Sequence, residues 1–273
     1  MEKLYVISCN VLWRELCYYA ALSPHSYTFH FLKQGLHNTP DILRSELQNA
    51  IDTIPPDEGF SAILIGYGLC SNGIEGITSR HTKLVIMRGH DCITFLLGSK
   101  ERYKSRMDES PGTYWYSPGW IETGFTPGKE TYKKLLETYT EKYGSDNAAY
   151  LMEMEQGWQS KYSAAAYIDL GFHNTDRYRN YTWESAKWLG WRFDDIAGDP
   201  HLVMDFLEGR WNGGDFLIVK PGETVAASHD DSIIKTNPIF TDTNAVADTP
   251  ENRHLSHNDK QNLYINRTEN QNL

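Results

Sequence analysis

Short apolar runs alternate with helical patterns through the first hundred residues. The runs stand at residues 4–7, 27–32, 62–65 and 84–87. Each is followed by a turn rich in glycine or polar residues, and most of these turns lead into a helical pattern. The clearest helix is opened by Thr39 and Pro40 and carries Leu43 and Leu47 at helical spacing. Strands that alternate with helices predict an α/β fold, with a parallel sheet covered by helices on both faces.

The pattern changes twice along the rest of the chain. An aromatic loop, YWYSPGWIETGFTPG, is followed by helical stretches, and the strand and helix alternation then resumes. From about residue 226 the chain is rich in Asn, Asp, Thr and His, which is typical of a disordered segment. Two α/β lobes, or one sheet with a helical insertion, both fit this pattern. The boundaries predicted are a first lobe at 1–111, an aromatic and helical insertion at 112–160, a second lobe at 161–225 and a disordered tail at 226–273.

Composition and charge narrow the possible functions. Apolar residues make up 40% of the 273 residues, and eight Trp and seventeen Tyr indicate real interiors. The formal net charge of -10 opposes binding to a phosphate backbone, so we expect no nucleic-acid partner. The chain opens without the pattern of a secretory leader, and no apolar run approaches the roughly 18 residues of a membrane span. We therefore expect a cytoplasmic protein that does not bind membranes.

The four cysteines all fall in the first hundred residues. In the predicted topology Cys9 ends the first strand, Cys70 follows the third, and His90 and Cys92 follow the fourth. Because parallel strands present their carboxyl ends at one edge of a sheet, these side chains are predicted to converge. Thiolates with an imidazole are ligands of zinc and related metals. The sequence therefore predicts a site for zinc or another transition metal, ahead of an iron–sulfur cluster, and Cys17 is assigned to packing.

Two alternatives to a metal site stay open. A free cysteine is often a buried packing residue, and the chain has no CxxC pair of the kind that marks structural zinc sites. A third interpretation has no metal, with Cys92 as a reactive thiol whose pKa is lowered in the first turn of a helix.

Residues near the cysteines are candidates for substrate binding. Gly66 and Gly68, on either side of Tyr67, permit close approach of a ligand to the backbone, yet they match neither a P-loop nor a dinucleotide motif. The aromatic loop, with Trp120, suits a lid over an organic substrate. We therefore predict a pocket beside the metal, walled by this loop and by Tyr67, for a small-molecule substrate.

His37 and Asp91 are candidates to support the metal ligands from behind. His37 comes from a polar loop at the same predicted edge. Asp91 is explained first as the N-cap of the following helix, and next as a hydrogen-bond partner of His90.

Three motifs resemble the DUF1638 family of bacterial and archaeal proteins. They are GYGLCSNGI, then GHDCITFLLGSKERY followed by PGTYWYSPGWIE, and the opening CNVLWREL. The resemblance covers roughly residues 4–222, and the matching positions are Cys9, Cys70, His90, Asp91 and Cys92. The family has no assigned activity, and its members, mostly from anaerobes, often accompany genes of corrinoid-dependent methyl transfer, which is an association of genes only. The resemblance thus implies a methyl or alkyl transfer and a corrinoid protein as a partner.

Together these features predict a metal-dependent enzyme that transfers a methyl or other alkyl group to a thiol or a corrinoid. The alternative is a non-catalytic protein that handles a metal or cofactor, or senses it, with the same ligands in a closed shell.

Overall fold

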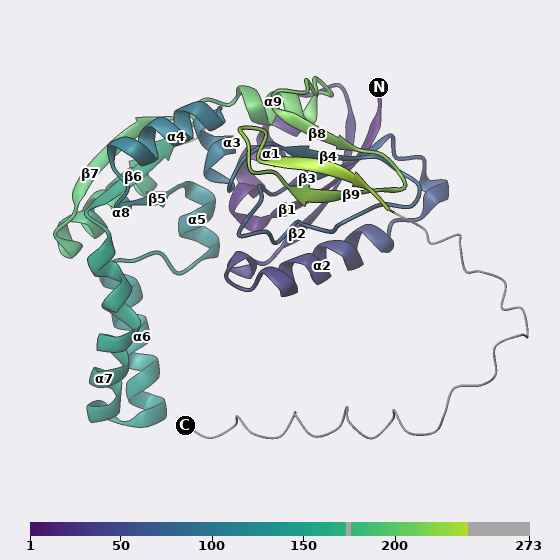
Figure 1. Ribbon diagram of the computed structural model, residues 1–273. Coiled ribbons are helices and arrows are strands. Elements are labelled where there is room, and N and C mark those ends of the chain that lie inside the picture. The colour runs from purple at the N-terminus through teal and green to yellow at the C-terminus, as the bar shows by residue number, and fades with distance from the viewer. Residues whose placement is uncertain (173–175, 240–273) are drawn as a thin grey trace, which may run out of the picture. The chain divides into compact units, whose positions relative to one another are not determined.

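The first sheet forms the centre of the protein. The computed structural model describes residues 1–172 and 176–239. The strand order is β2–β1–β3–β4–β8, with β8 antiparallel and the other four strands parallel (Figure 1). The strands are β1 (Lys3–Cys9), β2 (Ser26–Leu32), β3 (Ala62–Gly66), β4 (Leu84–Met87) and β8 (Phe216–Val219). Every residue of β3 and β4 is buried, which explains their unbroken apolar runs.

Helices cover both faces of the first sheet, which confirms the α/β prediction. The crossovers from β1 to β2 and from β2 to β3 run in opposite directions, so right-handed connections place α1 (Trp13–Leu22) and α2 (Pro40–Asp52) on opposite faces (Figure 1). The helix α9 (His201–Leu207) packs against α1. At the start of α2, Thr39 holds the N-cap position without a side-chain cap, because its hydroxyl donates to the Leu36 carbonyl instead.

The second sheet is parallel, in the order β5–β6–β7. Its strands are β5 (Thr113–Tyr116), β6 (Ala164–Asp169) and β7 (Arg192–Ala197), and α8 (Asp176–Leu189) packs on β6 and β7. The strand β5 lies inside the segment that the sequence predicts as an aromatic loop, so that prediction is wrong for its first residues. Trp115 packs into the core of the first sheet, and Tyr116 into a separate core with Tyr167. A strand covered on both faces accommodates aromatic residues at successive positions.

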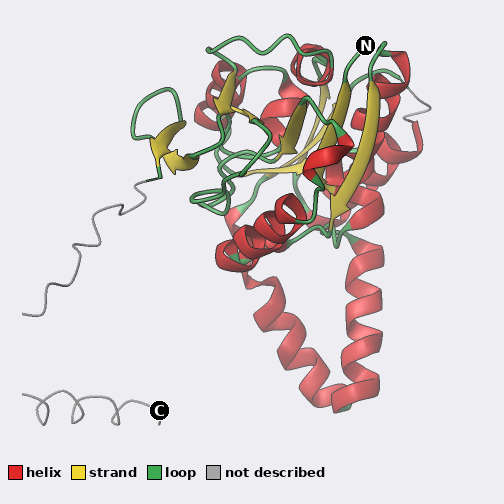
Figure 2. Ribbon diagram, turned by 90° about the vertical axis from the view of Figure 1, so that its right-hand side faces the viewer, coloured by secondary structure: helices red, strands yellow, loops and turns green. Residues whose placement is uncertain are grey.

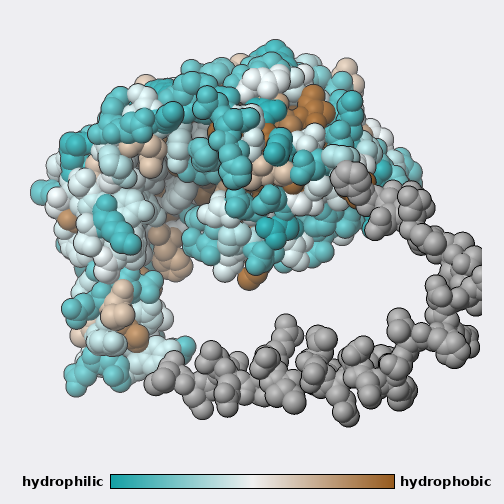
Figure 3. Space-filling model, in the orientation of Figure 1, coloured by the Kyte–Doolittle hydropathy of each residue, from teal (hydrophilic) through white to brown (hydrophobic). Residues whose placement is uncertain are grey.

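The remaining helices connect the two sheets or project from them. They are α3 (Ile93–Leu97), α4 (Lys100–Glu109), α5 (Pro118–Thr123), α6 (Lys129–Tyr143) and α7 (Ser145–Gln156), with short 3-10 turns at Asn10–Leu12, Leu36–Asn38, Pro56–Glu58 and Gly157–Lys161. The α6–α7 hairpin projects from the sheets (Figure 2). Tyr150 and Met154 are exposed on it, and the visible surface is otherwise mainly polar (Figure 3). Within the described ranges, no helix has the length and apolar character needed to cross a membrane.

The chain returns to the first sheet after completing the second. The strand β8, expected in a second lobe, pairs with β4 instead. A hairpin of β9 (Glu223–Ala227) and β10 (Ile234–Pro238) follows it. The tail predicted from residue 226 is therefore corrected, since folded chain extends to residue 239, and the rest of that prediction, 240–273, lies outside the described residues. The domain boundaries otherwise stay a prediction.

The sequence does not predict the hairpin because its strands have only five residues each, and polar residues stand among the apolar residues of both. Val225, Ile233 and Ile234 are nevertheless buried in the main core. Backbone bonds join Val225 to the chain near Gly76 and Ile77, with the Gly76 amide donating to the Val225 carbonyl at 2.8 Å.

Candidate functional site

The candidate site lies where the strand order of the first sheet reverses. The chain runs from β1 outward to β2 and then crosses to β3 on the other side, so the carboxyl ends of β1 and β3 form a topological switch point. Open α/β sheets bind ligands at such points. Cys9 is the last residue of β1, Tyr67 and Cys70 follow β3, and Cys92 follows the neighbouring β4.

The loop after β3 runs alongside the loop after β4. The Leu69 and Cys70 amides donate to the Gly89 and His90 carbonyls, each at 2.8 Å. Gly68 is required at this approach, because a Cβ atom there would lie 2.7 Å from both the amide nitrogen of Asp91 and the Gly89 carbonyl oxygen. The two loops therefore hold their cysteines at a fixed separation along the sheet edge.

Three consecutive non-glycine residues in this loop have left-handed backbone conformations. The φ angles are 46° at Cys70, 57° at Ser71 and 66° at Asn72. Such conformations cost about 1 kcal/mol or more each and concentrate at functional sites. The strained turn begins at one of the predicted metal ligands.

The three edge thiols are buried together. Cys9 is 6% exposed, and Cys70 and Cys92 are 7% exposed each. Burial raises the pKa of all three thiols. The pKa of Cys92 is raised further by the charges of Cys9, Asp91 and Cys70, so the thiols are close enough to influence one another. Burial thus outweighs the effect of the helix start, and the structure does not support Cys92 as a thiol of low pKa.

Tyr67 lies among the thiols, with its hydroxyl next to the Cys9 thiol. The residue is 2% exposed, and no described residue bonds its hydroxyl with normal geometry. Burial raises the pKa of Tyr67, and the neighbouring Cys9, Cys70 and Cys92 raise it further. The contact with Cys9, which falls outside normal geometry, lowers the pKa of that thiol against the effect of burial. A thiol is a weak acceptor for a buried hydroxyl, so a ligand with a stronger acceptor would be stabilised here.

Asp91 joins the thiol cluster to the helix α4. Its Oδ1 accepts the Ile93 amide at 2.9 Å, and its Oδ2 accepts the Tyr103 hydroxyl at 2.8 Å. The N-cap position of α3 is held by Cys92, one residue after the position that the sequence predicts. Burial raises the pKa of Asp91, and burial lowers the pKa of His37, on which Asp91 acts in the opposite direction. His90 is exposed, with its ring 6.4 Å from that of Tyr103. The structure therefore groups the three cysteines, Tyr67 and Asp91, and places His90 toward solvent.

The described side chains do not form a ready metal-binding group. Within residues 1–172 and 176–239, no three His, Cys, Asp or Glu side chains are arranged so that they could hold an ion. The metal site stays a prediction.

A cavity of about 1060 Å³ opens beside the thiol cluster. Its walls are α4 and the turn between β9 and β10, and it reaches His90 and Tyr103. The cysteines, Tyr67 and Trp120 are not among its lining residues, so the predicted walls of the pocket differ from those of this cavity. Trp120 instead packs against the main core, and its amide donates to the Ser117 hydroxyl, which caps α5.

Sequence reasoning missed Tyr103, which connects the cavity wall to Asp91. Tyr103 stands within the quoted GHDCITFLLGSKERY motif, twelve residues after Asp91. The sequence signal that could have identified Tyr103 is an aromatic residue on a helix whose other residues are mostly charged.

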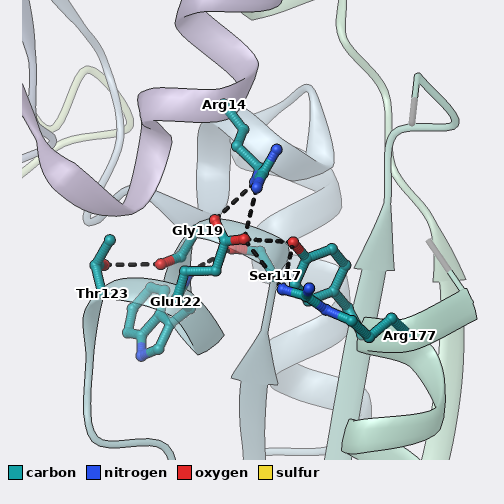
Figure 4. Close-up of polar contacts among 8 residues, drawn as sticks. Arg14, Ser117, Gly119, Glu122, Thr123 and Arg177 are labelled. Carbon is teal, nitrogen blue, oxygen red and sulfur yellow. Dashed lines mark hydrogen bonds and ion pairs between the residues drawn. The ribbon is translucent and has the colours of Figure 1, made fainter. Parts of the chain in front are cut away.

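Sequence reasoning also missed a polar network that joins α1, α5 and α8 (Figure 4). Glu122 of α5 accepts hydrogen bonds from Arg14 of α1 and from Tyr178 of α8. Glu122 also forms an ion pair with Arg177 at 3.4 Å. Next to Arg14, Glu15 is 1% exposed, and its Oε2 has no partner among the described residues.

Comparisons with known proteins place the chain in a family. Neither the curated proteins nor the solved structures include a match to it. Residues 31–207, well over half of the chain, match the family described as "Protein of unknown function (DUF1638)". The matched region includes Cys70, His90, Asp91 and Cys92, and it begins after Cys9. The chain therefore belongs to the DUF1638 family.

Proposed function

We propose that Cys9, Cys70 and Cys92 bind a soft transition-metal ion, with zinc as the first expectation, and that the protein is an enzyme of methyl or alkyl transfer. His90, two residues from Cys92, is the fourth side chain proposed to contribute. The reaction joins the alkyl carbon to a thiolate sulfur, while the bond from that carbon to its former carrier breaks and the carrier keeps the electron pair.

The observation that carries this proposal is the group of three buried thiols around the Tyr67 hydroxyl. The thiols come from three segments of the chain, the end of β1 and the loops after β3 and β4, and they lie near the switch point of the sheet. Among the described residues, this buried hydroxyl has only the weakly accepting Cys9 thiol beside it and no hydrogen bond of normal geometry. A bound group that accepts a hydrogen bond from Tyr67 would satisfy that hydroxyl.

The chemistry of the donor set fits a thiolate-binding metal. Burial keeps the three thiols protonated in the metal-free chain. A zinc ion at this site would be held by Cys9, Cys70 and Cys92 as thiolates and would supply the activation of a thiol at neutral pH. Tyr67 would donate a hydrogen bond within the thiol cluster.

The adjoining cavity favours an enzyme over a closed metal carrier. A carrier needs four protein ligands and no space for a substrate, whereas a catalytic site keeps an open position. The cavity of about 1060 Å³ reaches Tyr103, whose hydroxyl bonds Asp91 next to Cys92. Space for an organic molecule therefore reaches a side chain that is hydrogen-bonded to the residue preceding Cys92.

Metal content tests the first half of the proposal. The protein would be purified without oxygen and analysed for metals, together with the variants C9S, C70S and C92S. We expect about one ion per chain, lost from each of these variants. The matched control is C17S, which removes a thiol outside the cluster and should keep the ion. A metal-free native protein, or full metal content in the C9S/C70S/C92S triple variant, would contradict the proposal.

Alkyl transfer tests the second half. The metal-loaded protein would be given methylcobalamin as a small corrinoid probe and 2-mercaptoethanol as acceptor, and the methyl thioether and reduced cobalamin would be measured. We expect both products to form in equal amounts. Metal-edge spectra that no thiol perturbs, together with the absence of product, would favour the non-catalytic carrier or sensor.

A further inference from the structure

The cavity beside the thiol cluster has an acidic wall. Its charged lining residues comprise five carboxylates and two lysines: Glu101, Asp108, Glu109, Asp230, Asp231, Lys100 and Lys104. The Lys100 ammonium is directed to backbone, since it donates to the Gly214 carbonyl at 3.2 Å and to the Asp231 carbonyl at 3.0 Å. The net charge that faces a bound molecule is therefore negative.

Several of these carboxylates are free to meet a ligand. The side chains of Glu101, Asp108 and Asp231 make no ion pair or hydrogen bond with any residue in the described part of the chain. Asp230 is ionised at neutral pH, because bonds from Ser232 and Ser228 lower its pKa to about 2. Negative charge thus stands both on α4 and on the turn opposite to it.

The floor of the same cavity is apolar. Tyr103, Met107 and Ile233 line it, and the Tyr103 ring lies near the ring of His90. Aromatic faces and methionine sulfur attract alkyl groups that surround a positive centre. A neutral ligand would contact the apolar floor but would leave the carboxylates of the walls unpaired. An anionic ligand would be repelled by those carboxylates.

We propose that the cavity binds an organic onium cation, a quaternary ammonium or a sulfonium. This inference goes beyond the proposed function, because none of the three cysteines is among the residues that line the cavity. The carboxylates of the wall pair with the positive centre, and the aromatic ring and the methionine sulfur of the floor contact its alkyl groups.

Calorimetric titration of the full chain tests the ligand class with four probes of similar size. Tetramethylammonium and trimethylsulfonium are the cations, tert-butanol is neutral and acetate is anionic. We expect saturable binding of the cations alone, weakened by added salt because the wall is open to solvent. Equal binding of tert-butanol, or the absence of binding by either cation, would overturn the inference.

Charge-neutral variants locate the binding. The variant D108N/D231N should weaken cation binding by about ten-fold. The variant E137Q/E141Q makes the same change of charge on the exposed face of α6 and should bind as the native chain does. Cation binding that D108N/D231N leaves intact would place the site elsewhere and overturn the inference.

Metal analysis of the same samples separates the two proposals. Full metal content without cation binding would refute the onium site alone. Cation binding to a protein that takes up no metal would refute the metal site and leave the cavity assignment standing.

Discussion

At the scale of single residues, burial controls the protonation of the groups with most chemistry. The buried thiols and the Glu15 carboxyl are all held toward their neutral forms. Each of these groups therefore needs a partner that stabilises its charged form before it can ionise at neutral pH, and the metal-free chain does not supply that partner.

Glu15 should make the stability of the protein fall as the pH rises. Burial raises its pKa from 4.5 to about 7, so between these values the unfolded chain releases a proton that the folded chain retains. The free energy of unfolding should therefore fall by about 3 kcal/mol across this range. The variant E15Q lacks that loss, so its stability relative to the native chain should increase over the same range. Chemical denaturation at pH 4.5, 6 and 8 measures the difference, and exposed E153Q is the control. The prediction would be contradicted if the free energy of unfolding changed with pH to the same extent in E15Q and in the native chain.

The four thiols should differ in their rates of alkylation. The pKa of all four thiols is raised by burial, but Cys17 is partly exposed, whereas Cys9, Cys70 and Cys92 are buried. Because the thiolate is the reactive form, iodoacetamide at neutral pH should label Cys17 first in the chelator-treated protein. Peptide mass spectrometry at successive times measures the order. Labelling of Cys92 ahead of Cys17 would show a reactive thiol that the buried geometry does not predict.

At the scale of elements, α5 connects the two sheets. It packs closely on the turn after β1, where a Cβ atom on Gly119 would lie 2.0 Å from the Val11 carbonyl oxygen. Its Glu122 accepts bonds from Arg14 at 2.6 and 2.7 Å. One short helix thereby holds α1 of the first sheet and α8 of the second.

The variant E122Q should destabilise the protein by about 1–2 kcal/mol at neutral pH. Burial raises the pKa of Glu122, but the bonds from Arg14 and Tyr178 outweigh it and hold the pKa below its ordinary value. A lowered pKa contributes stability that is present above the ordinary value and lost as the pH falls through the folded-state value. The difference between E122Q and the native chain should therefore shrink in acid, as thermal unfolding can measure. A difference that stays constant down to pH 3 would assign it to packing alone.

The elements differ in how much the sequence reveals of them. The strands β3 and β4 are predictable because burial on both faces demands continuous apolar residues. The strands β5, β9 and β10 are not predictable, since they have only four or five residues each and pack against neighbours that are distant in sequence. The pairing of β8 with β4 has no local signal at all.

The candidate site, too, can be predicted from the sequence only in part. Strand order and shared carboxyl ends are enough to bring Cys9, Cys70 and Cys92 to one edge. The cavity could not be predicted, because one wall comes from the turn between β9 and β10. The position of Tyr103 depends on how α4 packs, which local spacing does not encode.

At the scale of the whole molecule, the final strands complete both the core and the cavity. Arg88, next to the end of β4, donates to the Ser232 and Ile234 carbonyls and ties the hairpin to the first sheet. Ile233 contributes to the core and to the cavity floor.

A chain ending at Gly222 should therefore be several kcal/mol less stable than one ending at Ile239, since buried side chains such as Val225 and Ile234 each contribute about 1.5–3 kcal/mol. Melting temperatures of the two chains measure the effect. The chain ending at Ile239 keeps every described contact and is the reference. Equal melting temperatures would show that the hairpin is dispensable for the core.

The second sheet leaves and rejoins the first at nearly one point. The Asp199 amide donates to the Leu96 carbonyl at 3.0 Å, and a Cβ atom on Gly98 would lie 2.6 Å from that of Asp199. A segment whose ends meet in this way can be gained, lost or exchanged in evolution without rethreading the sheet that carries it. Chains that share the cysteine loops could therefore differ in everything between these two positions and still place the same thiols at the same edge.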